Sequence, residues 1–104
     1  MVKWYRDLYV GEGVGKKAKK TAERIEKGKA APGIYLVTLA DHPDNILEIL
    51  PASLLLQKTA RRICPLIVGM AKGKEEAVLL TQRIIEETYQ ETGSFRVEEF
   101  IQDR

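Results

Sequence analysis

The first third of the chain changes from strand-like to helix-like spacing of its apolar residues. Over residues 4–10, a segment rich in aromatic residues has a period of two, which predicts a β-strand: Trp4, Arg6, Leu8 and Val10 alternate with Tyr5, Asp7 and Tyr9. After a glycine-rich stretch, Ala18, Ala22 and Ile25 recur at the i, i+4, i+7 spacing of one helix face, while lysines occupy the opposite face. The sequence therefore predicts a strand followed by an amphipathic helix over about residues 16–27.

Further segments follow the same two patterns. Nearly unbroken apolar runs at residues 34–40 and 65–69 lie beside turn residues, as buried strands do. Residues 74–91 have helical periodicity and end before Gly93, a residue type that commonly terminates helices. Residues 94–100, SFRVEEF, alternate again and predict a final strand.

Two segments of the chain resemble each other. LYVGEGVGK at residues 8–16 and LIVGMAKGK at residues 66–74 each place Gly-x-x-x-Gly-Lys between a predicted strand and a predicted helix. This similarity predicts two strand–helix–strand (βαβ) units in tandem. Two such units with right-handed crossovers form a four-stranded antiparallel sheet with both helices on one face. We therefore expect an α+β fold, a ferredoxin-like two-layer sandwich.

The segment between the two predicted units, residues 41–63, is too long for an unstructured loop. A turn at Pro43 would return residues 46–50 beside the preceding strand as a hairpin. Pro51 is suited to the first position of a helix that runs to about Arg61. An inserted hairpin and helix between the two units are therefore expected.

Two alternatives to this arrangement stay open. Residues 45–50 could instead form a helix that starts at Asn45, with Glu48 completing a capping box. The alternative fold is a three-layer open α/β sheet, because an extra helix in the middle of the chain could cover the other sheet face.

Length and composition limit the class of protein. The 104 residues suffice for one α+β domain spanning 1–104, and 44% hydrophobic and 31% charged residues are typical of a folded globular chain. The single cysteine, Cys64, lies beside an apolar run and is expected to be a buried small side chain. No stretch resembles a signal peptide or a membrane span, so a cytoplasmic protein without membrane association is expected.

The net charge of +2 is unevenly distributed along the chain. Residues 1–30 contain nine Lys/Arg against four Asp/Glu, a net +5, which leaves −3 for the remainder. Four lysines stand at the predicted start of the first helix, where the helix dipole favours acidic residues and each cation costs on the order of 0.3–1 kcal/mol. The later helix begins instead with Glu75 and Glu76. Such a departure from the usual preference is typical of a functional surface.

Three glycines precede these lysines and predict a turn whose N–H groups could point at an anion. The stretch matches neither the phosphate-binding pattern Gly-x4-Gly-Lys-Ser/Thr nor the dinucleotide pattern Gly-x-Gly-x-x-Gly. Glu12 inside the turn would repel a phosphate, and a merely solubilising helix face is the alternative explanation of the lysines. The candidate ligand-binding residues are Gly11, Gly13, Gly15, Lys16, Lys17 and Lys20.

Two other groups of residues are candidate sites. Several carboxylates surround the only histidine and could form the site of a small cofactor-free enzyme, although the same pattern is ordinary turn chemistry: Asp41, His42, Asp44 and Glu48. The aromatic residues of the first strand, beside Lys3 and Arg6, are a combination with which an open sheet can stack single-stranded RNA. The characteristic RNA-binding aromatic motif is absent.

The sequence favours a small non-catalytic binding or regulatory module that takes a phosphate-bearing anionic ligand at residues 11–20. No catalytic residue set, metal site or cofactor is expected, and nucleic acid is not expected as a partner. A two-layer fold leaves one sheet face uncovered, so a homodimer through that face is expected. The alternative functions are a small enzyme at Asp41 and His42 and an RNA-binding module.

Overall fold

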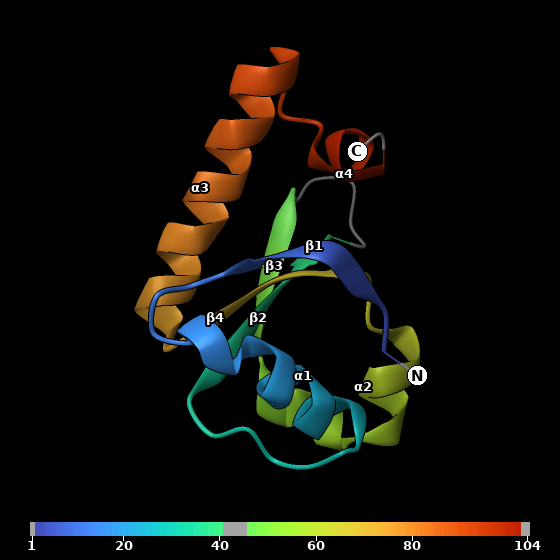
Figure 1. Ribbon diagram of the computed structural model, residues 1–104. Helices are drawn as coiled ribbons and strands as arrows, with labels where there is room; N and C mark the ends of the chain where they lie inside the picture. The colour runs from blue at the N-terminus through green and yellow to red at the C-terminus, as the bar shows by residue number, and fades with distance from the viewer. Residues whose placement is uncertain (1, 41–45, 103–104) are drawn as a thin grey trace.

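The computed structural model describes residues 2–40 and 46–102 and shows a mixed α/β domain built on one four-stranded sheet (Figure 1). The strands are β1 (Trp4–Val10), β2 (Ile34–Leu39), β3 (Leu47–Pro51) and β4 (Ile67–Lys72). The α-helices are α1 (Ala18–Glu26), α2 (Lys58–Ile63), α3 (Lys74–Thr92) and α4 (Val97–Gln102). The 3-10 helices η1 (Gly15–Lys17) and η2 (Ala52–Leu56) precede α1 and α2.

The order of strands in the sheet is β1-β4-β2-β3. β4 runs parallel to β1 and antiparallel to β2, so β1 and β2 run in opposite directions and the segment between them is not a parallel crossover. The predicted tandem of two strand–helix–strand units, and with it the ferredoxin-like arrangement, is therefore wrong. The most buried strand, β4, has five consecutive buried residues and takes a central position between β1 and β2.

The predicted hairpin in the middle of the chain is confirmed. β2 and β3 pair antiparallel from Leu39 opposite Leu47 to Tyr35 opposite Pro51. The alternative helix over residues 45–50 is wrong for the part that the structure describes. The turn residues 41–45 lie outside the described residues.

Helices cover both faces of the sheet (Figure 1). On one face, α3 and α4 enclose a cluster that includes Val37, Val68, Leu80, Ile84 and Phe100. On the other face, α1, η2 and α2 enclose a cluster that includes Ile25, Leu36, Leu55, Ile67 and Met70. The two-layer prediction is therefore wrong, and the layering is that of the three-layer alternative. Because neither face is open, the homodimer contact predicted through an uncovered sheet face is wrong as well.

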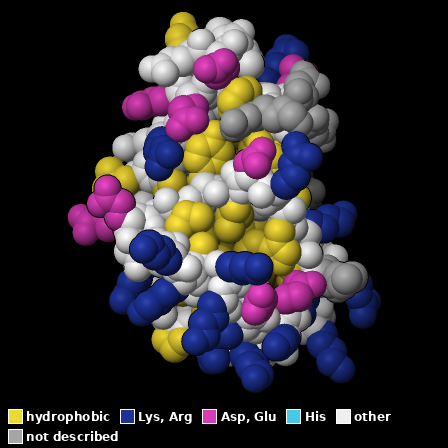
Figure 2. Space-filling model, viewed as in Figure 1, with side chains coloured by type: hydrophobic (Ala, Val, Ile, Leu, Met, Phe, Trp, Pro, Cys, Tyr) yellow, Lys and Arg dark blue, Asp and Glu magenta, His cyan; other side chains and the backbone are white. Residues whose placement is uncertain are grey.

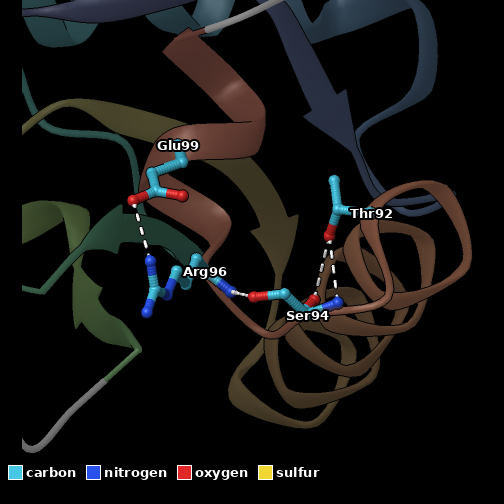
Figure 3. A network of polar contacts seen from close by, with 4 residues as sticks. All are labelled: Thr92, Ser94, Arg96 and Glu99. Carbon is cyan, nitrogen blue, oxygen red and sulfur yellow. Dashed lines mark hydrogen bonds and ion pairs between the residues drawn. The ribbon is translucent and has the colours of Figure 1, made fainter.

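The last segment forms the helix α4, so the final strand predicted over residues 94–100 is wrong. Buried Val97, Phe100 and Ile101 have the i, i+3, i+4 spacing of a helix face and pack in the α3 cluster. The turn before α4 is held by polar contacts among Thr92, Ser94, Arg96 and Glu99 (Figure 3). The Arg96 N–H donates to Ser94 Oγ at 3.1 Å, which satisfies a main-chain donor at the start of the helix.

The helix predicted from Pro51 to Arg61 is divided into two short helices. Pro51 ends β3, and Gln57 is extended at φ −89° and ψ 130° between η2 and α2. α2 lies against the C-terminal end of α1, where Arg61 Nη1 donates to the Ile25 carbonyl and Nη2 to the Glu26 carbonyl, each at 2.6 Å. Arg61 therefore adds a charged donor to two carbonyls at the end of α1, of which the Ile25 carbonyl also accepts the Gly28 N–H at 3.0 Å.

Cys64 is buried, as predicted, with 8% of its surface exposed. Burial raises the pKa of its thiol, because an apolar environment disfavours the thiolate. A thiol in this state is a poor nucleophile, which agrees with a packing role.

Candidate functional site

The glycine-rich turn after β1 holds a carboxylate that belongs to the chain itself. Glu76, in the first turn of α3, accepts hydrogen bonds from the Gly13 N–H at 2.7 Å and from the Lys72 N–H at 2.6 Å. Gly11 lies so close to this carboxylate that a Cβ atom at Gly11 would be 2.5 Å from Glu76 Oε2. Because Gly11 has no side chain, the turn has room for an anionic group, and the Glu76 carboxylate occupies that room.

The main-chain N–H groups of all three predicted glycines are engaged within the protein. The Gly13 N–H donates to Glu76, and the Gly11 N–H donates to the Met70 carbonyl at 2.8 Å. The Gly15 N–H donates to the Gly11 carbonyl at 3.1 Å, where η1 begins. A ligand at this end of the molecule would therefore be held by side chains rather than by the turn.

The predicted lysines lie on the surface beside the turn. Lys16 and Lys17 belong to η1 and Lys20 to α1, and all three residues are exposed. Within residues 2–40 and 46–102, none of the three has a carboxylate at ion-pair distance. In Figure 2, dark blue Lys and Arg side chains gather on the lower part of the molecule, where Figure 1 shows α1 and α2.

A hollow of about 210 Å³ lies beside these lysines. Lys17, Arg24 and Lys72 line it, together with Thr21, and its remaining walls are mostly apolar. The Arg24 guanidinium is already engaged, because Nε and Nη2 donate to the Ala30 carbonyl at 3.2 and 3.0 Å. Two ammonium groups and one hydroxyl remain as donors for an anion of small size.

Of the residues that line this hollow, the sequence predicted Gly13 and Lys17 but not Thr21, Arg24 or Lys72. Lys72 ends β4, which lies beside both β1 and β2 in the sheet, so its approach to the turn follows from strand order. No local pattern indicates that position. The acidic start of α3 was visible in the sequence, but its contact with the glycine turn was not.

The second candidate site falls largely outside the described residues. Asp41, His42 and Asp44 belong to the segment 41–45. Glu48 is half-buried on β3, opposite Thr38 on β2. In the part of the chain that the structure describes, no group of three or more His, Cys, Asp or Glu side chains is placed to hold a metal ion.

The aromatic residues of β1 are built into the domain. Tyr9 is 7% exposed beneath α3, and its hydroxyl donates to Glu87 Oε1 at 3.2 Å. Trp4 is half-buried, and its Nε1–H donates to Glu26 Oε2 at 3.3 Å. Neither ring lies on an open sheet face, so the stacking platform that the alternative RNA-binding function requires is covered.

No helix among the described residues has the length and apolar character needed to span a membrane. No family model, no curated protein and no solved structure matches this chain.

Proposed function

We propose that the chain is a non-catalytic binding module that takes a small phosphate-bearing anion in the hollow between α1 and the start of β2. The observation that supports this proposal is that Lys17 and Lys72 both line that hollow. Among the described residues, neither has a carboxylate at ion-pair distance. The Thr21 hydroxyl adds a neutral donor. The site is the predicted Gly/Lys end of the protein, with the lysine side chains as the binding groups.

The position of the lysines beside the start of α1 supports the same proposal. Lysines placed at a helix N-terminus oppose the helix dipole, and a bound anion removes that unfavourable interaction. An anion in the hollow would therefore stabilise the folded protein.

Inorganic phosphate is expected to raise the melting temperature of the protein. At a concentration about tenfold above its Kd, a ligand adds about 1.4 kcal/mol to the free energy of unfolding. For a domain of this length, that gain corresponds to roughly 6 °C or more. Thermal melts in rising phosphate, with chloride at equal ionic strength as the reference, measure the shift.

The Lys17→Ala/Lys72→Ala variant is expected to lose this shift, because it removes both free ammonium groups of the hollow. The matched control is Lys58→Ala/Arg62→Ala, which removes two exposed cations from α2, outside the hollow. A control that also loses the shift would mean that phosphate acts through general charge screening, and the proposal would be abandoned.

We also propose that a second copy of the chain docks on α3. The outer side of α3 exposes Leu79 to 63% and Tyr89 to 50%, and Phe95 stacks on Tyr89 with ring centroids 4.8 Å apart. Exposed apolar side chains along one helix are suited to a partner, and a two-fold axis would place the same helix antiparallel on its copy. The expected dimer contact was a sheet face that α3 and α4 cover, so the exposed side of α3 is proposed as the contact instead.

The Leu79→Glu variant is expected to be monomeric if α3 forms the contact. The substitution adds a charge to an exposed position that would be buried between two copies, and light scattering after size exclusion measures the mass. Ile63→Glu is the matched control, since Ile63 is 68% exposed on α2. A wild-type protein that is monomeric at all concentrations would refute the contact.

A further inference from the structure

The two helical layers carry opposite charge. On the face covered by α1, η2 and α2, residues 12–29 and 52–63 contain ten Lys/Arg against three Glu, a net +7. On the face covered by α3 and α4, residues 74–102 contain three Lys/Arg against seven Glu, a net −4. Sequence segments far apart are therefore sorted by charge, with the sheet between them.

The layer of α1, η2 and α2, called the basic layer below, is continuous because α2 is joined to α1. The hydrogen bonds from Arg61 to the carbonyls of Ile25 and Glu26 fix α2 against the end of α1. Exposed Lys27 and Lys29 follow α1, and exposed Lys58 and Arg62 belong to α2. Cations of α1 and α2 are thus neighbours, and dark blue Lys and Arg side chains are frequent in the lower part of Figure 2, where Figure 1 shows these two helices.

Within the described residues, the exposed cations of the basic layer form no ion pair with a carboxylate. The ion pairs among the described residues, Arg83 with Glu87 and Arg96 with Glu99, are both in the acidic layer. A one-sided array of unpaired cations, wider than a single phosphate, is complementary to a chain of phosphates.

We infer that the basic layer, through the exposed Lys and Arg side chains of residues 16–29 and 58–62, binds the phosphate backbone of duplex nucleic acid without sequence preference. The inference rests on the proposed function, because one backbone phosphate would occupy the hollow at Lys17 and Lys72. A duplex is favoured over a single strand because Tyr9 is buried and Trp4 is half-buried and bonded to Glu26, which leaves β1 without a free stacking platform. The inference departs from the expectation that nucleic acid is not a partner, because the sequence did not place α2 beside α1.

Fluorescence anisotropy with a labelled DNA duplex of mixed sequence tests this inference. With about four to six phosphate contacts, the affinity is expected to fall by roughly two to three orders of magnitude between about 50 and about 200 mM salt. A duplex of unrelated sequence should bind equally well, and a single strand of the same length should bind more weakly. Tighter binding of the single strand would overturn the inference.

Charge reversals at matched positions locate the surface. Lys20→Glu in α1 and Arg62→Glu in α2 are each expected to weaken duplex binding about tenfold and to reduce the slope of log affinity against log salt by about one or more. Arg96→Glu makes the same change of charge in the acidic layer and should leave both quantities unchanged. Equal losses in all three variants would overturn the assignment to the basic layer.

Measuring the melting shift in phosphate and the duplex affinity on the same variants distinguishes this inference from the proposed function. Arg62→Glu should keep the melting shift with phosphate while losing duplex affinity. Phosphate stabilisation without any duplex binding at low salt would overturn the inference alone, and sedimentation with equimolar phosphatidylserine and phosphatidylcholine vesicles in that case would assign the basic layer to a membrane surface. Duplex binding that Lys17→Ala/Lys72→Ala leaves intact would instead refute the placement of a backbone phosphate in the hollow.

Discussion

The Arg61→Ala variant is expected to be less stable than the wild type by roughly 2–4 kcal/mol, because several main-chain carbonyls lose a charged donor. Arg61 Nη1 donates to the Ile25 carbonyl at 2.6 Å and to the Leu55 carbonyl at 3.3 Å, and Nη2 donates to the Glu26 carbonyl at 2.6 Å. These contacts are partly buried at the junction of α1, η2 and α2. Urea denaturation monitored by circular dichroism measures the difference.

Two further variants make this result specific to the guanidinium group. Arg62→Ala removes the neighbouring, exposed arginine and should change the stability by less than about 0.5 kcal/mol. Arg61→Lys should recover only part of the loss, since one ammonium group cannot reproduce the forked donation of a guanidinium. Equal stability of Arg61→Ala and Arg62→Ala would show that Arg61 does not join the helices.

The parts of the fold that the sequence predicted are those with long or uniform patterns. The helix predicted over 74–91 is α3, Lys74–Thr92, and it ends at Gly93, whose φ of 72° is the left-handed conformation that glycine adopts easily. The apolar run at 34–40 is β2. Such patterns depend on neighbours in the chain, so they can be recognised without knowledge of the tertiary contacts.

The parts that were wrong depend on contacts between distant residues. The segment SFRVEEF alternates in period two and also contains Val97 and Phe100 at helical spacing, and packing on α3 selects the helix. The insertion of β4 between β1 and β2 is equally non-local, and it converts the predicted antiparallel sheet into a mixed one. Neither choice is decided by the local residues alone.

The candidate site shows the same limit. The glycines and lysines at residues 11–20 predicted an anion at the turn, and the structure places the Glu76 carboxylate there. Gly13 and Glu76 lie 63 positions apart in the sequence, and only the pairing of β1 with β4 brings them together. What remained predictable was the surplus of positive charge on the α1 side.

The Gly11→Ala variant is expected to lose about 2 kcal/mol of stability. A Cβ atom at this position would lie 2.5 Å from Glu76 Oε2 and 2.7 Å from Glu76 Cδ, so the carboxylate must leave its place between the Gly13 and Lys72 N–H groups. The loss is that of two hydrogen bonds to a charged acceptor, reduced because water can reach the exposed donors that remain. Chemical denaturation gives the magnitude.

A double-mutant cycle assigns this loss to the carboxylate rather than to the backbone. Glu76→Ala alone should be destabilising by a similar amount, and Gly11→Ala should then cost little in the Glu76→Ala background, because the new methyl group would meet empty space. The interaction energy between the two positions should approach the cost of either single change. Additive effects would mean that Gly11 is required by its own main-chain geometry, and that the glycine turn is not built around the Glu76 carboxylate.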